Sequence, residues 1–346
     1  MYYDKYINMK TSKSKKIIPA CILLATVSLC GCAGRNNTAG YQKSGLYFDT
    51  AVSVEIYASS PEEAEPVLEE CMNICAHYQD MFDAQIITSD IANINSSAGK
   101  SVTVDEDTVL LLEEALKYCS LSGGAFDISI KPVTELWDFH EGAERIPSDE
   151  ELQASLKHVD WNNISVDPVN NTVTLNDPDS SIDLGAVAKG YVADKITEYL
   201  ESLSITGAIV NMGGDMRLIG TKPDGSMFNI GINDPFDSGS VSMALYLSDT
   251  SVATSGTYER CFEKDGVLYH HILDPQTGMP CDTDIRSVTV ITKSATDADC
   301  LCTVCILKGS SQSLSLIERI PDTEAVFITN DGSVLTTSGA ERLIRH

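Results

Sequence analysis

The spacing of hydrophobic residues predicts a strand and two helices in the first part of the folded chain. Residues 46–58 alternate between apolar and polar side chains, which is typical of a strand with one buried face. Apolar residues then recur at helical spacing from Pro61 to Phe82 and predict an amphipathic helix. Asp105 is a suitable N-cap for a second helix, which is expected to reach Ser120 because Gly123 and Gly124 follow and end it.

The middle of the chain mixes short strands with helices. Residues 124–130 are expected to return to a strand, and residues 165–176 have the pattern of a hairpin. Ser148 followed by Glu151 forms a capping-box pattern, which predicts that a helix begins here and continues to His158.

A strand followed by a helix is expected around residue 185. Residues 181–184 are mainly apolar and predict the end of a strand, and the small residues of 185–190 open an amphipathic helix. Residues 208–220 predict another strand, interrupted by Gly213-Gly214. Paired glycines weaken a strand and usually indicate a bulge or a place where a ligand lies against the backbone.

More antiparallel strands are expected towards the C-terminus. Residues 228–235 and 243–249 are predicted strands, residues 251–260 a loop, and residues 263–280 a hairpin that runs into a turn at 274–278. Helices and strands therefore mix without regular alternation. The sequence predicts an α+β fold with largely antiparallel sheets.

The N-terminus has the pattern of an export signal. Four lysines precede an apolar run from Ile17 to Leu29, which is too short to be a stable membrane span. The run ends in Leu29-Cys30-Gly31-Cys32, which resembles a bacterial lipobox and implies a lipid on Cys32; cleavage of an ordinary secreted protein nearby is the alternative. We expect a lipoprotein signal peptide at 1–31, a polar tether at 32–45 and one folded domain at 46–346.

The chain is strongly acidic. Its 346 residues carry a formal net charge of −26, and residues 1–31 hold five basic and one acidic residue, so the remainder carries −30. Such a charge excludes nucleic acid as a partner and disfavours binding of the folded part to an anionic membrane surface. An anionic ligand has to be held by local features such as a metal ion, helix N-termini and a few cations.

Eight of the eleven cysteines lie beyond the signal region. Cys71, Cys75 and Cys119 fall on apolar faces of predicted helices, where a thiol behaves as a small hydrophobic group. The run Cys300-x-Cys302-x-x-Cys305 has the look of a soft-metal ligand set but lies in a continuous apolar stretch. Buried thiols are therefore favoured over a zinc or iron–sulfur site, which stays the alternative.

Two short segments have the chemistry to hold a phosphorylated ligand with a cation. The predicted strand-to-helix turn offers free backbone N–H groups, to which Lys189 adds a cation and Asp183 a hydrogen-bond acceptor. Asp299 and Thr303 lie one helical turn apart and offer hard oxygen ligands, which suit Mg²⁺ or Ca²⁺ rather than zinc. A tight turn with a solvated lysine, and a helix cap formed by Thr296 with Asp299, are the plainer alternatives.

Seven motifs occur in the order and approximate spacing of the FAD:protein FMN transferase family, also called ApbE. They are FDT, GAFDISIKPVTELW, IDLGAVAKGY, VNMGGD, ATSGTYER, HHILDPQTGMP and TDADCLCT. The resemblance covers about residues 46 to 340 and implies a single large α+β domain related to the T-fold. The enzymes of this family are Mg²⁺-dependent, lie outside the cytoplasm and are commonly lipoproteins.

The resemblance also implies roles for individual residues. The metal ligands of the family fall on the Ala186 carbonyl oxygen, the Asp299 carboxylate and the Thr303 hydroxyl. Its proposed general base falls on His271, which follows a second histidine. Its FAD contacts fall on Phe48, Ala125, Phe126, Asp127, Asp183, Lys189 and Ile272.

Two residues depart from the family pattern. Cys302 stands where relatives commonly have Ser or Asp, which puts a fourth metal ligand in doubt. Gln85 stands where many members place an aromatic residue near the flavin, so stacking at that place is expected to be weaker or to come from elsewhere.

The activity implied by the resemblance is transfer of FMN from FAD to a Thr or Ser hydroxyl of a target flavoprotein. The product is a phosphoester, and AMP is released. Mg²⁺ is the expected metal, FAD the substrate, and acceptor flavoproteins such as subunits of membrane redox complexes the expected partners. The expected location is the extracytoplasmic face of the cell membrane, with the anchor at Cys32. Two alternatives stay open: Mg²⁺-dependent hydrolysis of FAD to FMN and AMP, and a lipid-anchored flavin-binding protein without turnover.

Overall fold

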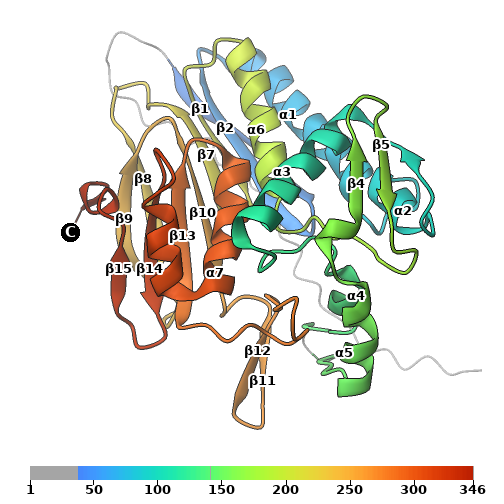
Figure 1. Cartoon of the computed structure of the whole chain (residues 1–346). Helices are drawn as coiled ribbons and strands as arrows, with labels where there is room; N and C mark the ends of the chain where they lie inside the picture. Colours follow the sequence, from blue (N-terminus) through green and yellow to red (C-terminus); the bar gives the residue numbers. More distant parts are fainter. Residues whose placement is uncertain (1–37, 141, 346) are drawn as a thin grey trace, which may run out of the picture. The chain divides into compact units, whose positions relative to one another are not determined.

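An eight-stranded sheet organises the part of the chain that the structure describes. This computed structural model describes residues 38–140 and 142–345 (Figure 1). Neighbouring strands are antiparallel throughout, in the order β1-β2-β6-β7-β10-β13-β14-β15. The strands are β1 (Ala39–Tyr47), β2 (Thr50–Ala58), β6 (Gly207–Met212), β7 (Asp215–Gly220), β10 (Thr250–Gly256), β13 (Ile285–Thr292), β14 (Glu324–Thr329) and β15 (Val334–Thr336).

Helices cover one face of this sheet (Figure 1). The helices α1 (Pro61–Phe82), α6 (Ala188–Ser202) and α7 (Ala295–Ile317) pack directly on the strands, and α3 (Glu106–Ser122) packs against α7. Alternate residues of β2, as predicted from its pattern, point into the main hydrophobic core that these elements enclose. The helix α7 is long and apolar enough to cross a membrane, but it packs on β10, β13 and α6, so its apolar character is that of a core helix.

The opposite face of the sheet carries a second, smaller core. A three-stranded sheet in the order β16-β9-β8 contributes to it, with β8 (Phe228–Asn233), β9 (Val241–Leu247) and β16 (Ile344–Arg345). Phe228 and Leu245 pack there with Leu218 of β7 and Val252 of β10. The central strands are thus buried on both faces.

Shorter elements complete the part of the chain that the structure describes. They are α2 (Asp90–Asn95), β3 (Val102–Thr103), α4 (Lys131–Thr134), α5 (Asp149–Ser155), η1 (Leu156–His158), η2 (Trp161–Asn163), β4 (Ile164–Asp167), β5 (Thr172–Leu175), β11 (Cys261–Lys264), β12 (Val267–His270) and η3 (Ala340–Arg342). A third cluster, built on Val133, Trp137, Leu152 and Leu273, lies at α4, α5 and the β11–β12 hairpin.

Several predictions that rest on local signals are confirmed, and so is the α+β fold class. The helix α1 begins and ends at the predicted residues. The N-cap Asp105 and the predicted capping box of Ser148 with Glu151 are both formed, while α3 extends two residues beyond Ser120. The predicted hairpins at β4–β5 and β11–β12 are present.

The prediction of a loop at 251–260 is wrong for residues 251–256, which belong to the central strand β10, and holds for residues 257–260. The hydroxyl-rich sequence of β10 is typical of a loop, yet these hydroxyls have partners inside the fold. Thr254 Oγ1 lies 2.8 Å from Thr289 Oγ1, and Ser251 Oγ donates to the Lys293 carbonyl oxygen at 3.0 Å. A buried hydroxyl with a hydrogen bond costs little, so polar residues are tolerated in this strand.

The predicted strands at 124–130 and 181–184 are also wrong. The two segments are joined by an isolated bridge between Ile130 and Ser181 and by a hydrogen bond from the Asp183 N–H to the Ile128 carbonyl oxygen, without a strand ladder. Gly124 has φ +83°, and the following residues are held by side-chain hydrogen bonds instead of a strand ladder. Both segments are therefore ordered turns that approach the beginning of α6.

Two boundaries differ from those expected. Gly213-Gly214 is neither a bulge nor an interruption but the two-residue turn of the β6–β7 hairpin, with φ of +72° and +109°. Residues 39–45 of the expected tether belong to β1, which pairs with β2. β1 is an edge strand with many exposed residues, so its sequence is as polar as a linker. The predicted signal peptide, Cys32 and the tether up to residue 37 lie outside the described residues.

Candidate functional site

The candidate site forms where the start of α6 meets the first turns of α7. A Cβ atom on Gly190 would lie 2.3 Å from the Ala295 carbonyl oxygen, so only glycine allows the two helices to come this close. The Gly190 N–H donates to Asp299 Oδ2 at 3.0 Å. We call this place the α6–α7 corner, comprising Ala186, Lys189, Gly190, Asp215, Asp299 and Thr303.

Lys189 lies between two carboxylates in the α6–α7 corner. Its Nζ is 3.3 Å from Asp299 Oδ1, 3.5 Å from Asp215 Oδ2, and also donates to the Gly185 carbonyl oxygen at 3.3 Å. Burial acts to lower the pKa of Lys189, but the two carboxylates outweigh it and hold the pKa above its usual range. Burial raises the pKa of Asp215, Lys189 opposes this, and the Asp299 charge adds to it. Because one lysine lies between two acids, the α6–α7 corner carries no excess of positive charge. A further cation can therefore be accommodated there.

The oxygen donors of the α6–α7 corner fit a hard divalent cation. Asp299 is buried, and Thr303 follows it by one helical turn with a hydroxyl that has no hydrogen-bond partner in the described part of the chain. Ala186 is partly buried in the turn that precedes α6. A carboxylate, a hydroxyl and a carbonyl oxygen are suitable ligands for Mg²⁺. The Cys302 thiol instead donates to the Ala253 carbonyl oxygen in β10 at 3.2 Å.

The start of α7 differs from the predicted cap. Ser294, not Thr296, is the N-cap, and its side chain accepts a hydrogen bond from the Asp297 N–H. Asp299 is therefore not part of a capping box, and its carboxylate points to α6.

His271 follows β12 and is held as a neutral base. Its Nδ1 lies 3.1 Å from the Glu259 carbonyl oxygen. Because a carbonyl only accepts, Nδ1 carries the proton and Nε2 keeps its lone pair. Burial is the main cause that lowers the pKa of His271 to about 4; the hydrogen bond to Glu259 opposes it, and the charges of Arg260 and Lys189 add to the lowering. The influence of Lys189 places His271 within electrostatic range of the α6–α7 corner.

Several residues that the resemblance assigns to FAD have side chains engaged in the fold. The Phe126 and Ile272 side chains are buried in the main core. The Asp127 carboxylate, whose pKa burial raises, accepts from the Ser129 N–H and hydroxyl and from the Trp161 N–H. These side chains already have partners, so a ligand at this segment meets backbone groups, including those of the partly buried Ala125.

Asp183 and Phe48 lie at turns. The Asp183 carboxylate accepts from the Gly185 N–H at 2.7 Å, and its own N–H donates to the Ile128 carbonyl oxygen, so the 125–128 segment lies beside the turn before α6. Phe48 is in the β1–β2 turn with φ +52°, a strained value for a bulky residue, and its N–H donates to Gln79 of α1. Gln85 is exposed.

Two acids at the site escaped sequence reasoning. Asp215 contacts Lys189. The sequence signal that could have indicated Asp215 is its place directly after Gly213-Gly214, because the tight turn fixes where this carboxylate points. A Cβ on Gly213 would lie 2.3 Å from Thr50 Oγ1, so the β6–β7 turn also packs against the start of β2. Asp194 of α6 bonds the first residues of α7, and no local pattern indicates a partner 100 residues away.

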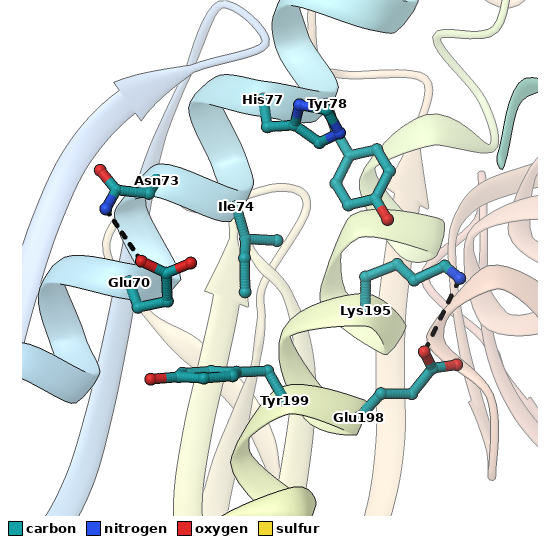
Figure 2. Close-up of a pocket in the computed structure, with 8 residues that line it drawn as sticks. All are labelled: Glu70, Asn73, Ile74, His77, Tyr78, Lys195, Glu198 and Tyr199. Atoms are coloured by element: carbon teal, nitrogen blue, oxygen red, sulfur yellow. Dashed lines mark hydrogen bonds and ion pairs between the residues drawn. The ribbon is translucent and has the colours of Figure 1, made fainter. Parts of the chain in front are cut away.

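An open pocket lies elsewhere on the described part of the chain. It has a volume of about 550 Å³ and lies between α1 and α6 (Figure 2). Its polar groups are largely paired with one another or with neighbours: Asn73 donates to Glu70 at 3.0 Å, and Lys195 lies 3.7 Å from Glu198 and 2.8 Å from Asp107. None of the predicted site residues lines it, so the α6–α7 corner with His271 is the better candidate.

The likeness to known proteins covers most of the chain. The model of the ApbE family matches residues 48–327. The chain is 34% identical over 336 residues to the FAD:protein FMN transferase of Treponema pallidum, covering 92% of this chain and 93% of that protein. It is 30% identical over 300 residues to the enzyme of the same name from Klebsiella pneumoniae, covering 86% and 92%.

Solved structures show the same fold. The ApbE protein of Thermotoga maritima superposes with a TM-score of 0.80 at 32% identity, over 89% of this chain and 100% of that one. The flavin transferase ApbE of Vibrio cholerae superposes with a TM-score of 0.78 at 28% identity, over 88% and 99%. Matched in sequence and fold over most of its length, the chain belongs to the ApbE family.

Proposed function

We propose that this chain is an Mg²⁺-dependent FAD:protein FMN transferase. The observation that carries the proposal is the α6–α7 corner, where Lys189 Nζ lies 3.3 Å from the buried Asp299 carboxylate. Thr303 follows Asp299 by one turn of α7, and its hydroxyl has no hydrogen-bond partner among the described residues. Such a group of hard oxygen donors and one cation suits a pyrophosphate bound with a metal ion. The names of relatives that match over about nine tenths of both chains support FAD as the substrate and a flavoprotein as the acceptor.

In the proposed reaction a hydroxyl oxygen of the acceptor protein attacks the phosphorus of the FMN half of FAD. The P–O bond to AMP breaks, AMP leaves, and a phosphoester forms. A Thr or Ser hydroxyl is a weak nucleophile near neutral pH, so a base that takes its proton accelerates the attack. His271 suits this role because its Nδ1–H is committed to the Glu259 carbonyl oxygen, which leaves Nε2 free to accept the proton.

The other residues of the α6–α7 corner would bind and orient the substrate. Asp299, Thr303 and the Ala186 carbonyl oxygen would hold Mg²⁺, which when bound supplies positive charge to the pyrophosphate. Lys189 keeps its proton over the whole physiological range, because the neighbouring carboxylates raise its pKa. It therefore adds a permanent cation beside the phosphates of an otherwise acidic protein.

We also propose that the protein is a lipoprotein on the extracytoplasmic face of the membrane. The lysines before the apolar run at 17–29 and the lipobox-like ending at Cys32 support this location. Removal of residues 1–31 and lipidation of Cys32 would leave β1 only a few residues from the anchor. Metabolic labelling with a radioactive fatty acid tests it: wild type should be labelled and Cys32→Ala should not.

One experiment separates the proposed transfer from its alternatives. Purified protein is incubated with FAD and Mg²⁺, with and without an acceptor flavoprotein, and both AMP and covalently bound flavin are measured. AMP and protein-bound flavin that appear only with the acceptor support transfer. AMP released equally without acceptor indicates hydrolysis, and FAD binding without AMP indicates a flavin-binding protein.

A further inference from the structure

A single carboxylate of α6 bonds the beginning of α7 through four hydrogen bonds. Asp194 Oδ2 accepts from the Ser294 hydroxyl at 2.8 Å, from the Thr296 N–H at 2.9 Å and from the Thr296 hydroxyl at 2.7 Å. Asp194 Oδ1 accepts from the Ala295 N–H at 2.8 Å. The acid thus satisfies two of the free N–H groups of α7, and its negative charge lies at the positive end of that helix.

These bonds are made by the same helix faces that form the α6–α7 corner. Asp194 follows Gly190 by one turn of α6, and Asp299 follows Ala295 by one turn of α7. The helices are therefore joined at two successive turns: Asp194 bonds the Ala295 N–H, and the Gly190 N–H bonds Asp299. The contact of Gly190 with Ala295 lies between these two connections.

We propose that Asp194 is a positioning residue for the metal site. It holds α7 in the register that places Asp299 against Lys189 and Gly190, and it acts through this register because its own hydrogen bonds go to Ser294, Ala295 and Thr296. The inference rests on the proposed function, because it concerns the geometry of the same metal site. Partners behind metal ligands commonly set the affinity for the metal, and their loss costs about 10- to 100-fold.

A plainer role for Asp194 is to stabilise α7 as any cap would. The chain offers a matched control, because α7 has a cap of its own: Ser294 accepts from the Asp297 N–H at 3.1 Å. Ser294→Ala removes that cap and one of the bonds to Asp194. It leaves the three bonds from Ala295 and Thr296 that join α6 to α7.

The test compares Asp194→Asn with Ser294→Ala in the full chain. Mg²⁺ affinity is measured by calorimetry, and FMN transfer is measured across a range of Mg²⁺ concentrations. We expect Asp194→Asn to raise the Kd for Mg²⁺ by about 10- to 100-fold, with transfer largely restored at saturating Mg²⁺ and little change in the KM for FAD. Ser294→Ala should lower the melting temperature and leave the Kd within about twofold of wild type.

Two further measurements keep the inference open to refutation. If Asp194→Asn does not fold, Thr296→Val removes one hydroxyl donor to Asp194 and should raise the Kd in the same direction by a smaller factor. Hydrogen exchange of the Gly190 amide without metal should be faster in Asp194→Asn than in Ser294→Ala, because this amide bonds Asp299.

An unchanged Kd in Asp194→Asn, or an equal rise in both variants, would show that Asp194 only caps α7. Failure of the proposed function has a different signature. Wild type would then bind no Mg²⁺ or transfer no FMN, while the exchange of the Gly190 amide would still report whether Asp194 sets the contact between the helices.

Discussion

The two halves of the candidate site are built in different ways. The α6–α7 corner lies on the main core, with Gly190 pressed against Ala295 and Asp299 bonded to both Lys189 and Gly190. His271 instead lies directly after the β11–β12 hairpin. We call the hairpin together with His271 the arm (Cys261–His271). The arm projects away from the sheet in Figure 1 and rests on the small third cluster.

The packing of the arm is aromatic and local. The Phe262 and Tyr269 rings stack at 5.3 Å, and Trp137 stacks on Phe139 at 5.6 Å beside them. The Trp137 indole N–H donates to the Gly278 carbonyl oxygen at 2.9 Å and so holds the turn after His271. Under the proposed function, the corner would hold the metal and the pyrophosphate, and a separately supported base would take the proton of the acceptor hydroxyl.

Removing the carboxylate of the α6–α7 corner should have the largest effect. Asp299→Ala removes the proposed metal ligand and the partner of Lys189, so transfer should fall by on the order of 10³-fold or more, without rescue by added Mg²⁺. A zinc-selective chelator should leave wild type active. Asp297→Asn is the control, because Asp297 is an acid on the same helix whose carboxylate accepts a hydrogen bond from Tyr118. Its transfer rate should stay within a few-fold of wild type. Full activity of Asp299→Ala in metal-depleted buffer would remove the corner from the mechanism.

Removing the base on the arm should affect chemistry and not binding. His271→Ala should lower kcat for transfer by roughly 10² to 10⁴ while FAD affinity barely changes, because a general base acts in the transition state. Stopped-flow binding of FAD and single-turnover transfer measure the two quantities. A loss of affinity in proportion to rate would make His271 a ligand contact, and the contrast between corner and arm would disappear.

Filling the contact between the helices should disturb the corner alone. The Cβ of Gly190→Ala overlaps the Ala295 backbone, so α6 and α7 must separate. Such overpacking typically costs about 1–3 kcal/mol of stability, and the Kd for Mg²⁺ should rise by about 10-fold or more. Thermal unfolding and calorimetry check both, with Ser202→Ala at the exposed end of α6 as control. A variant with normal Mg²⁺ affinity would show that the corner tolerates movement.

The lowered pKa of His271 predicts a smaller effect, on the pH dependence of transfer. In model compounds the imidazole side chain has a pKa of about 6.5. Burial lowers the pKa of His271 to about 4, so the base stays neutral and competent above that pH and is lost only as the pH falls through about 4. The kcat/KM for transfer should therefore change little between pH 7 and pH 5. An acid limb centred near 6.5 would mean that the arm leaves His271 open to solvent in the working enzyme.

The cysteines of α7 should matter least. Cys300, Cys302 and Cys305 are buried free thiols, and the Cys302 thiol faces β10. Replacing Cys302 by Ser and Cys305 by Ala should change stability by about 1–2 kcal/mol and leave transfer intact. Elemental analysis before and after the replacement is the check. Stoichiometric iron or zinc in wild type that is absent from the variant would establish the metal cluster instead.

Local signals in the sequence were enough for α1, but not for the start of α7, the short helices α2 and α4 or all of the strands. The bounds of α1 follow from its apolar stripe and from the residues that flank it, both of which are present in the sequence itself. The strand β10 could not be recognised, because the partners of its hydroxyls, Thr289 and Lys293, come from β13 and the residue that follows it. Tertiary hydrogen bonds, not local propensity, make this segment a strand.

The site divides in the same way. That Asp299 and Thr303 share a helix face follows from their spacing, but the partners of Asp299, Lys189 and Gly190, lie far away in the chain. The family resemblance implied that Asp299 and the turn at Ala186 belong to one site, which helical periodicity could not indicate, and the bonds to Lys189 and Gly190 came from the structure. Neither helical spacing nor the family resemblance indicated Asp194, because its role becomes visible only when the start of α7 is placed beside it.

The distance along the chain between Lys189 and Asp299 has a consequence for how the protein comes into being. The two residues are 110 positions apart, and the strands β6, β7, β10 and β13 that lie between them in the chain pack against α6 or α7. Closing so long a loop costs conformational entropy, so we expect this contact to form after the strands between the two helices are ordered. A chain cut before Ala295, or still emerging from a ribosome or a membrane channel, lacks Asp299 and Thr303 of the proposed metal site. If the proposed function holds, catalysis begins only with the finished fold, and the release of AMP would serve as an assay for complete folding.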